Sequence, residues 1–318
     1  MTFGGLARMG NSIKSLAFVV LGLGILLFMI PPAFPGQVII ESNDQFEFAR
    51  ASMEGGDYSG AVGEFKRFIH FFPKDPKVPA AQFLIGICHL KDRRHEAARD
   101  IFFEINRSDP ESPFAAKALF LIGESYYQQG VVKEAGHYFV QVIEKYPQIE
   151  LKNTALYRLG WTKMKGNKWA DASQAFSKVE QESRFYYSSQ HLAEQSLKGE
   201  TLLYKSPALA GSLAAIVPGL GHAYVSRYKD AAIAFLLNGL FIWAAVESFH
   251  EDHEVLGGIL TFLEIGWYSG NIYSAVNVTH KHNRKIQNEF RSTLKDRLDL
   301  RLFTAREGHV GLALTWRF

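Results

Sequence analysis

The sequence predicts an all-α fold: a solenoid of helical hairpins, then a helical membrane module, with a short C-terminal β-hairpin. Three observations predict it. Four kinds of residue recur at intervals of 37 through the first half of the chain, apolar segments follow Pro207, and apolar residues alternate strictly near the C-terminus. A fixed period of this length is typical of stacked helical repeats.

The repeated positions carry a small residue, an alanine, a phenylalanine and a proline, in that order. They are Ala49, Gly86, Gly123 and Gly160; Ala61, Ala98, Ala135 and Ala172; Phe65, Phe102, Phe139 and Phe176; and Pro73, Pro110 and Pro147. Glycine costs about 1 kcal/mol inside a helix, so the small residues predict close approach of a second helix. Alanine and phenylalanine four apart share one face of that second helix, and proline ends it. Residues 43–184 are therefore predicted to form four helix–turn–helix units, closed by a capping helix at 185–205.

This pattern resembles the tetratricopeptide repeat, over the stretch from Asn43 to Lys178. The family's unit has about 34 residues, and each unit here is longer because of Pro-rich stretches such as Asp109–Pro113. In that respect it is similar to the repeats of bacterial envelope proteins, notably the Tol-Pal-associated periplasmic protein and the outer-membrane assembly lipoprotein. The resemblance implies a non-enzymatic protein that binds a protein or peptide partner.

Residues 1–36 predict export. Arg8 and Lys14 precede the unbroken apolar run from Leu16 to Ile30, which is the pattern of a signal sequence. The stretch Pro31–Gly36 offers no clean cleavage site, so a cleaved signal peptide and an uncleaved signal anchor both stay open. Either outcome places the repeats outside the cytoplasm of a bacterium.

Three apolar segments follow Pro207 and define a membrane module of residues 206–282. Residues 231–249 and 255–278 are long enough to cross a hydrocarbon layer of about 30 Å. Residues 208–225 contain Pro218-Gly219 and either span the membrane or form a broken or re-entrant segment. Basic residues flank the pair of longer segments and an acidic loop, 251–254, separates them, so the positive-inside rule places the loop outside. If 208–225 also crosses, the repeats lie in the periplasm and the protein is anchored in the bacterial inner membrane.

The module also resembles a small bacterial helical membrane domain of unknown function. The matching residues are Pro218 to Tyr224, Arg227-Tyr228 and Asn238. The resemblance implies membrane residence and no particular chemistry. Glu264 lies within an apolar segment, and Asn238 on the neighbouring segment is its predicted hydrogen-bond partner, because polar groups in membranes usually face other protein.

A partner-binding groove is predicted on the first helices of the repeats, which line the concave surface of such stacks. The predicted residues are Arg50, Phe83, Ile87, Phe120, Glu124, Tyr127, Tyr157 and Trp161. Aromatic residues and arginine are typical anchors of interfaces. The alternative is that the column Phe46, Phe83, Phe120 and Tyr157 is inter-helix core; Arg50, Tyr127 and Trp161 are expected to be more exposed.

The sequence argues against several classes of function. The net charge of +3 is too small to indicate nucleic-acid binding. No nucleophile–base arrangement or phosphate loop is visible, so no enzyme, cofactor or small-molecule substrate is predicted. The cluster His250–Glu254 is interpreted as a hydrated loop rather than a metal site, and the single cysteine, Cys88, as a small core residue.

The tail of residues 283–318 is basic, and its apolar residues alternate as in a β-hairpin. They are Leu298, Leu300 and Leu302, then Val310, Leu312, Leu314, Trp316 and Phe318. Taken together, the sequence predicts an envelope scaffold that contacts membrane lipid and binds a protein or peptide of the envelope. The alternatives are a membrane module that assists insertion or transport with the repeats as a docking arm, and an outer-membrane assembly factor.

Overall fold

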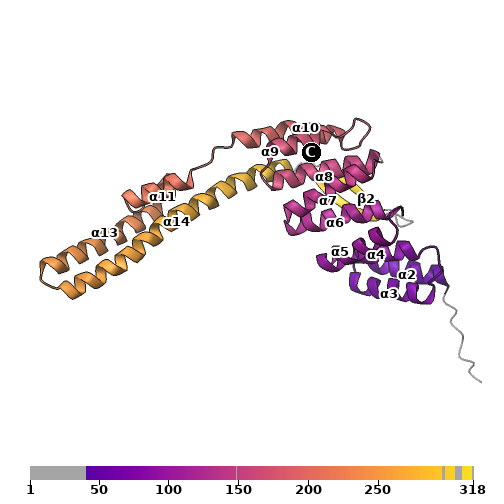
Figure 1. The fold of residues 1–318 in the computed structure, drawn as a ribbon, viewed down its shortest axis with the longest axis horizontal. Helices are drawn as coiled ribbons and strands as arrows, with labels where there is room; N and C mark the ends of the chain where they lie inside the picture. Colours follow the sequence, from indigo (N-terminus) through magenta and orange to yellow (C-terminus); the bar gives the residue numbers. More distant parts are fainter. Residues whose placement is uncertain (1–40, 148, 296–297, 305–309, 317–318) are drawn as a thin grey trace, which may run out of the picture. The chain divides into compact units, whose positions relative to one another are not determined.

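A computed structural model describes residues 41–147, 149–295, 298–304 and 310–316 (Figure 1). The predicted signal peptide or anchor, residues 1–36, lies outside the described residues. The chain divides into two units between Asp44 and Gln45. All described helices and strands lie in the second unit, except for the first turn of the helix that begins at Ser42.

Four helical hairpins follow one another as the period predicts. They are α2 (Ser42–Glu54) with α3 (Tyr58–Phe71), α4 (Val78–Lys91) with α5 (His95–Ser108), α6 (Ala115–Gln129) with α7 (Val132–Lys145), and α8 (Ile149–Lys165) with α9 (Trp169–Ser177). The prolines Pro73, Pro110 and Pro147 each stand two residues beyond the end of a second helix, where a missing N–H costs nothing. The predicted capping helix is α10 (Tyr186–Leu197), followed by the short 3₁₀ helix η1 (Lys198–Thr201).

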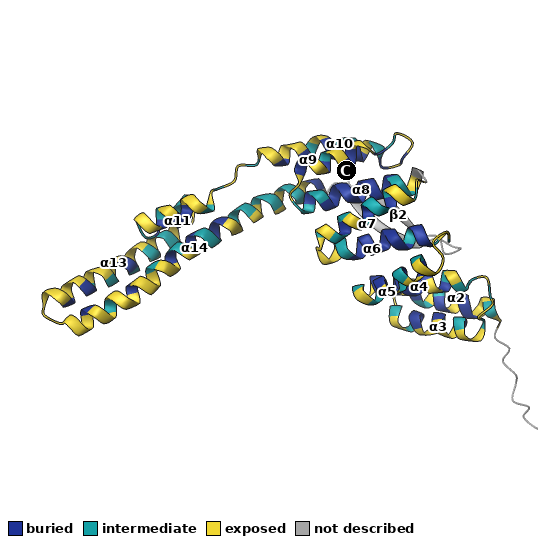
Figure 2. Cartoon of the chain, in the orientation of Figure 1, coloured by how far each residue is buried: buried dark blue, intermediate teal, exposed yellow. Residues whose placement is uncertain are grey.

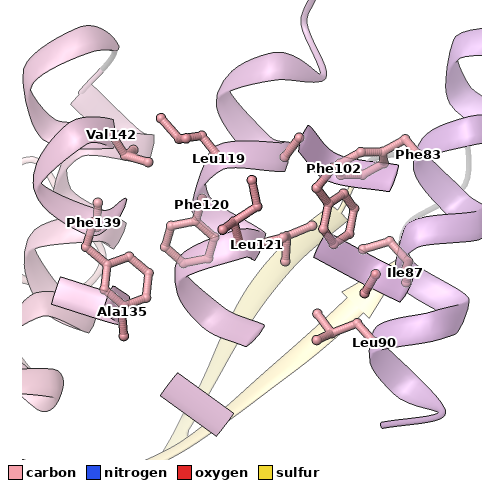
Figure 3. Close-up of a cluster of buried hydrophobic side chains, with 14 of the residues drawn as sticks. Phe83, Ile87, Leu90, Phe102, Leu119, Phe120, Leu121, Ala135, Phe139 and Val142 are labelled. Carbon is pink, nitrogen blue, oxygen red and sulfur yellow. The ribbon is translucent and has the colours of Figure 1, made fainter. Parts of the chain in front are cut away.

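The small-residue column explains how each hairpin closes. A Cβ on Gly123 would lie 2.9 Å from Cε1 of Phe139, and one on Gly160 would lie 2.5 Å from Cε1 of Phe176. Each repeated phenylalanine therefore packs directly on the backbone of its partner helix. The aromatic columns meet in the same layer: the Phe120 and Phe139 ring centroids are 5.3 Å apart (Figure 3). The predicted close approach is confirmed.

The turns inside the hairpins form a fifth column at the same period. Gly56, Arg93, Gly130 and Asn167 all have positive φ, between 59° and 85°. At each turn, the residue that follows the left-handed position donates its N–H to the carbonyl five residues before it, as Val131 does to Tyr126. Glycine and asparagine suit this conformation, whereas Arg93 adopts it at a cost.

Residues 208–225 do not form a continuous helix. The structure breaks them into α11 (Pro207–Ile216) and α12 (Leu220–Tyr224), joined through Gly219 at φ +91°. Ten helical residues reach only about 15 Å, half the hydrocarbon thickness. Of the two alternatives for this segment, the structure therefore favours the broken one.

Two long helices follow, α13 (Tyr228–His250) and α14 (Glu254–Lys295), which pack against each other as an antiparallel hairpin. Among the described residues only α13 is long and apolar enough to cross a membrane by length and composition. The predicted crossing segment 255–278 is the first part of the 42-residue α14, and polar residues such as Glu264 and Asn271 dilute it. Only 17% of the apolar window of α13 is buried, and Figure 2 shows exposed positions along both helices.

The far end of α14 packs against the last repeat. Phe290 contacts Trp169 edge-on, with ring centroids 5.4 Å apart, and Leu294 belongs to the buried core of the repeats. Further toward the N-terminal end of α14, Asn283 bonds the backbone of Lys205: its Nδ2 donates to the Lys205 carbonyl, and its Oδ1 accepts from the Lys205 N–H. The last strands, β1 (Leu298–Thr304) and β2 (Val310–Trp316), pair antiparallel with Leu298 opposite Trp316, so the predicted hairpin is present.

Candidate partner-binding site

A cavity of about 670 Å³ opens where the ends of the first helices of the repeats meet α14. Its lining residues come from the α4–α5 turn and from α5, α6, α8 and α14: Arg93, His95, Tyr127, Gln128, Trp161, Lys165, Asn288, Arg291 and Ser292. Residues far apart in the sequence are thus gathered at one place by the repeat period and by the docking of α14.

A buried ion pair lies close to this cavity. Arg158 Nε donates to Glu124 Oε2 at 2.7 Å, and both side chains are almost fully buried. The carboxylate of Glu124 raises the pKa of Arg158 against the opposing effect of burial, so the guanidinium stays charged. The same guanidinium lies over the ring of Tyr127, 4.2 Å from its centroid. The pair therefore holds Tyr127 in position by a cation–π contact.

Tyr127 is contacted by a second cation. Lys165 Nζ donates to the carbonyl of Tyr127 at 2.7 Å and lies 4.6 Å from the ring centroid. Burial raises the pKa of the Tyr127 phenol, which stays neutral at physiological pH. The ring thus offers a fixed apolar edge beside an ammonium group.

Arg291 of α14 caps the C-terminal end of α8. Its Nη1 donates to the carbonyls of Met164 and Lys165 and to Asn167 Oδ1, at 3.2, 3.0 and 2.9 Å. A cation at a helix C-terminus satisfies carbonyls that have no helical partner and interacts favourably with the helix dipole. Burial lowers the pKa of Arg291. The contact ties α14 to the repeats and leaves the guanidinium on the cavity wall.

The cavity wall is basic. Arg93, Lys165 and Arg291 line it, and no aspartate or glutamate does so among the described lining residues. His95 also lines it, but burial, with Arg99 and Arg93 nearby, lowers the pKa of its imidazole, so it adds no charge at neutral pH. A concave surface with one sign of charge attracts ligands of the opposite sign.

Comparisons with known proteins identify the repeats. Tetratricopeptide-repeat models match residues 46–113, and 117–148 with 154–182. The repeats are tetratricopeptide repeats. Such repeats stack into scaffolds with concave surfaces that bind proteins or peptides. No curated protein sequence matches this chain.

Solved structures with similar folds are distant. A tetratricopeptide repeat protein from Parabacteroides merdae is 14% identical, with a TM-score of 0.41, covering 80% of this chain and 98% of that one. Pseudomonas aeruginosa pilF is 13% identical, with a TM-score of 0.34, covering 78% and 97%. The nearly identical TPR-like repeats of a Podosopora anserina protein are 15% identical, with a TM-score of 0.42, covering 51% and 90%. Identities and scores this low carry no functional conclusion.

Of the predicted partner-binding residues, some lie at or near the cavity and the others lie elsewhere in the repeats. Tyr127 and Trp161 line the cavity together, although Trp161 is only 7% exposed, so the expectation that it is exposed was wrong. Glu124 is buried in the ion pair with Arg158. Arg50 is half-buried and paired with Glu47, away from the cavity lining.

The remaining predicted residues lie in the core of the repeats: Phe83, Phe120 and Tyr157 as the alternative interpretation held, and also Ile87, which that alternative did not include. Phe83, Ile87, Phe120 and Tyr157 are all buried in one hydrophobic cluster. Burial raises the pKa of Tyr157 to about 12. These side chains hold the tetratricopeptide hairpins together and offer no surface to a partner in this structure.

Sequence reasoning missed the residues that α14 and the α4–α5 turn contribute to the site. Arg291 and Asn288 lie in the tail, and nothing in their local sequence indicates that α14 returns to the repeats. Arg93 was detectable: it stands 37 residues after Gly56 and 37 before Gly130, at a turn that favours glycine. A non-glycine residue at positive φ on a cavity wall motivates the hypothesis that Arg93 has a functional role.

The predicted contact between Asn238 and Glu264 is not formed. The Asn238 amide donates to Ala234 O, one turn earlier in its own helix, and neither carboxylate oxygen of Glu264 has a hydrogen-bond partner in the described part of the chain. Glu264 is 7% exposed and lines a separate cavity of about 380 Å³ with apolar neighbours such as Ile242 and Phe249. The Asn238 amide nitrogen is thus bonded within its own helix, and its Oδ1 has no partner among the described residues.

Two further predictions concern residues outside the groove. Cys88 is buried, and burial raises the pKa of its thiol to about 12, which fits a core role. No group of three or more metal-ligating side chains occurs among the described residues. The exposed cluster His250–Glu254 consists of the last residue of α13, the connection 251–253 and the first residue of α14.

Proposed function

We propose that this protein is a membrane-anchored, non-enzymatic adaptor of the bacterial envelope, whose tetratricopeptide repeats bind an acidic segment of a partner protein. The observation that supports it most is the cavity wall, where Arg93, Lys165 and Arg291 surround the edges of Tyr127 and Trp161. Carboxylates fit the cations, and an apolar side chain fits the aromatic edges. Anchoring would raise the local concentration of the repeats at the membrane.

Membrane anchoring is supported by the surfaces of α13 and α14. Large apolar side chains are exposed along both helices, among them Phe235, Trp243, Phe262 and Trp267. A contiguous apolar surface of this kind is unfavourable in water and is expected in lipid. The alternative in which these helices fold back on protein leaves this exposure without an explanation.

If α13 and α14 cross the membrane as a hairpin, the basic residues before α13 and after the apolar part of α14 lie on the same side of the membrane as the repeats. The segment before α13 is broken and too short to cross, and α14 returns to the last repeat through Arg291. The export sequence and the positive-inside rule then disagree about which side this is. We place the repeats in the periplasm, at the inner membrane, because the first apolar segment usually sets the orientation.

Cysteine labelling tests the anchoring. Single cysteines at Gln129 and Asp252, in a Cys88→Ala background, are treated in intact cells with an impermeant maleimide. We expect Gln129 to be labelled and Asp252 to be protected, because in the proposed anchor α13 and α14 each cross once, which would put the two positions on opposite sides of the membrane. Labelling of Asp252 alone would place the repeats in the cytoplasm, and labelling of both would contradict the hairpin.

Arg93 offers a test of partner binding that does not endanger the fold. Replacing it by glycine removes one cation and relieves a left-handed backbone, so the repeats remain folded. The probe is a fluorescein-labelled peptide combining glutamates with leucine and phenylalanine, and its twin carries glutamine for glutamate. We expect Arg93→Gly to weaken binding of the acidic peptide by up to about fivefold, measured by anisotropy.

The matched control is Arg94→Gln. Arg94 is the neighbouring cation, exposed and paired with Asp92, and it does not line the cavity. It should leave the affinity unchanged. Equal losses in both variants would show that overall charge is what the peptide senses, and equal binding of the acidic peptide and its amide twin would refute the proposed site.

A further inference from the structure

A second cavity, of about 630 Å³, lies within the helical module between α12, α13 and α14. Its lining changes character along its length. One end carries charged and polar groups: Arg227, Asp230, Asn277 and Lys281. The other end carries Ile233, Leu237, Gly266, Trp267 and Gly270. Because α13 rises about 1.5 Å per residue, the ten residues from Arg227 to Leu237 span about 15 Å.

The polar end has an excess of positive charge. Arg227 forms an ion pair with Asp230, one turn apart at the start of α13. Lys281 is exposed and has no ion pair among the described residues. His222 Nε2 and Ser274 Oγ lie 3.1 Å apart and add hydrogen-bonding groups beside these charges. The cavity therefore suits a group with one negative charge and several acceptor oxygens.

An unsatisfied amide lies deeper in the cavity. Asn271 is 7% exposed, and neither its Nδ2 nor its Oδ1 has a hydrogen-bond partner in the described chain. A buried amide without a partner is costly, and native proteins rarely leave one. Asn271 lines the cavity between the charged end and the glycine end, and both amide atoms are covered, so a ligand would bond them only once the side chain turned toward it.

The apolar end has an open furrow. A Cβ at Gly266 or Gly270 would meet nothing within 4 Å, although both glycines lie inside α14. Close packing, which explains Gly123 and Gly160 in the repeats, does not explain these two. Two glycines one turn apart therefore leave open space on the helix surface along the cavity.

We propose that this cavity binds one anionic phospholipid, with the phosphodiester at Arg227 and Lys281, the ester carbonyl region at Asn271 and an acyl chain along Gly266 and Gly270. A polar end, a hydrogen-bonding middle and an apolar end in that order match the chemistry of a phospholipid from headgroup to chain. Basic pockets between membrane helices bind anionic headgroups in this way. The inference rests on the proposed membrane anchoring of α13 and α14.

Fluorescence quenching in liposomes tests it with the full chain. The liposomes are phosphatidylcholine with a minor fraction of acyl-brominated phosphatidylglycerol or, for comparison, the same fraction of acyl-brominated phosphatidylcholine. Trp267 lines the cavity and Trp243 does not. We expect Trp267 to be quenched more by the anionic lipid, with enrichment of about fivefold, the factor expected for one net basic residue. Trp267→Phe should remove this excess and Trp243→Phe should keep it.

Matched glycine variants separate occupancy from folding. Gly270→Leu fills the furrow and should abolish the excess quenching of Trp267, as should Lys281→Gln. Gly258→Leu is the control, because Gly258 is also in α14 with open space around its Cβ position and does not line the cavity. It should behave like the unmodified chain.

Three outcomes would overturn the proposal. Equal quenching by the two brominated lipids, in a protein that floats with the liposomes, would refute the lipid site alone. Loss of the excess on adding glycerol phosphate or inorganic phosphate would show that the cavity takes free phosphate instead. Failure of the protein to float with the liposomes would refute the membrane anchoring itself.

Discussion

The tetratricopeptide repeats and the α13–α14 hairpin treat charge and apolar surface in opposite ways. In the repeats, buried Glu124 is paired with Arg158, and the phenylalanines that recur at intervals of 37 lie inside. In the hairpin, buried Glu264 has no partner among the described residues, while Trp243 and Phe262 face outward. Inward aromatic side chains suit water and outward apolar side chains suit lipid, whereas a buried carboxylate without a partner is costly in either surrounding. Under the proposed anchoring, the two regions of the chain lie in different solvents.

The largest difference in stability effect between the repeats and the α13–α14 hairpin is expected when a buried glutamate is replaced. Glu124→Ala leaves Arg158 buried without a counter-charge and should cost about 3–5 kcal/mol of repeat stability. Glu264→Leu removes a charge that has no partner among the described residues and should leave α13 and α14 as stable or more stable. Hydrogen exchange of the amides in α6, α8, α13 and α14 of the detergent-solubilised chain measures both.

The control is the double variant Glu124→Leu with Arg158→Met, which removes both charges and should restore much of the stability lost by Glu124→Ala. Destabilisation of the hairpin by Glu264→Leu would show that this carboxylate has a partner. If Glu264→Leu lost cellular function while its hydrogen exchange stayed unchanged, the alternative in which the membrane module has its own activity would be favoured.

Replacing a glycine by alanine should lower stability in the repeats and raise it in α14. Gly123→Ala puts a Cβ 2.9 Å from the Phe139 ring and should destabilise the third repeat by about 1–3 kcal/mol. Gly258→Ala meets open space and should stabilise α14 by up to about 1 kcal/mol, the difference in helix propensity. Exchange in α6 and in α14 compares them, and a stabilising Gly123→Ala would contradict the packing of phenylalanine on glycine.

Arg93 sharpens the comparison within the repeats themselves. Arg93→Gly should stabilise the α4–α5 hairpin by about 1 kcal/mol, because glycine adopts positive φ without strain. The corresponding change at a glycine turn, Gly130→Ala, should destabilise α6–α7 by a similar amount. Thermal unfolding and exchange of α5 and α7 measure the two effects. A stability gain combined with weaker peptide binding would show that Arg93 is retained for function.

The repeats could be predicted from the sequence because each of their contacts is local and recurs. Gly86, Gly123 and Gly160 indicate where a helix must come close, and the structure supplies the ring that does so, from the same hairpin. The burial of Trp161 was not predicted, since the pattern identifies a helix face but not how far the next helix covers it.

The sites could be predicted only in part, because they depend on non-local contacts. Tyr127 was found from its place on a first helix. Arg291 and Asn288 reach the cavity only through the return of a 42-residue helix, and no period in the tail indicates that return. Gly270 and Asn271 look ordinary in sequence, and the open furrow and the unpaired amide become visible only once α13 is placed beside α14.

The smallest expected effect is a loss of repeat stability in mild acid. Burial lowers the pKa of the His89 and His95 imidazoles below their ordinary value of 6.5. The unfolded chain therefore binds these protons first, so the stability they contribute is present above pH 6.5 and declines as the pH falls below it. The carboxylate of Glu180, whose pKa is lowered by Lys152, loses its contribution only below its ordinary value of 4.5.

Exchange of α4 and α5 amides between about pH 6.5 and 5, corrected for the intrinsic pH dependence, should report this decline. The double variant His89→Asn with His95→Gln should show a flatter profile over the same interval. Protonation of His95 also adds a cation to the cavity, so the acidic peptide should bind more tightly as the repeats weaken. Stability and affinity that fell together would mean that His95 does not face the bound peptide.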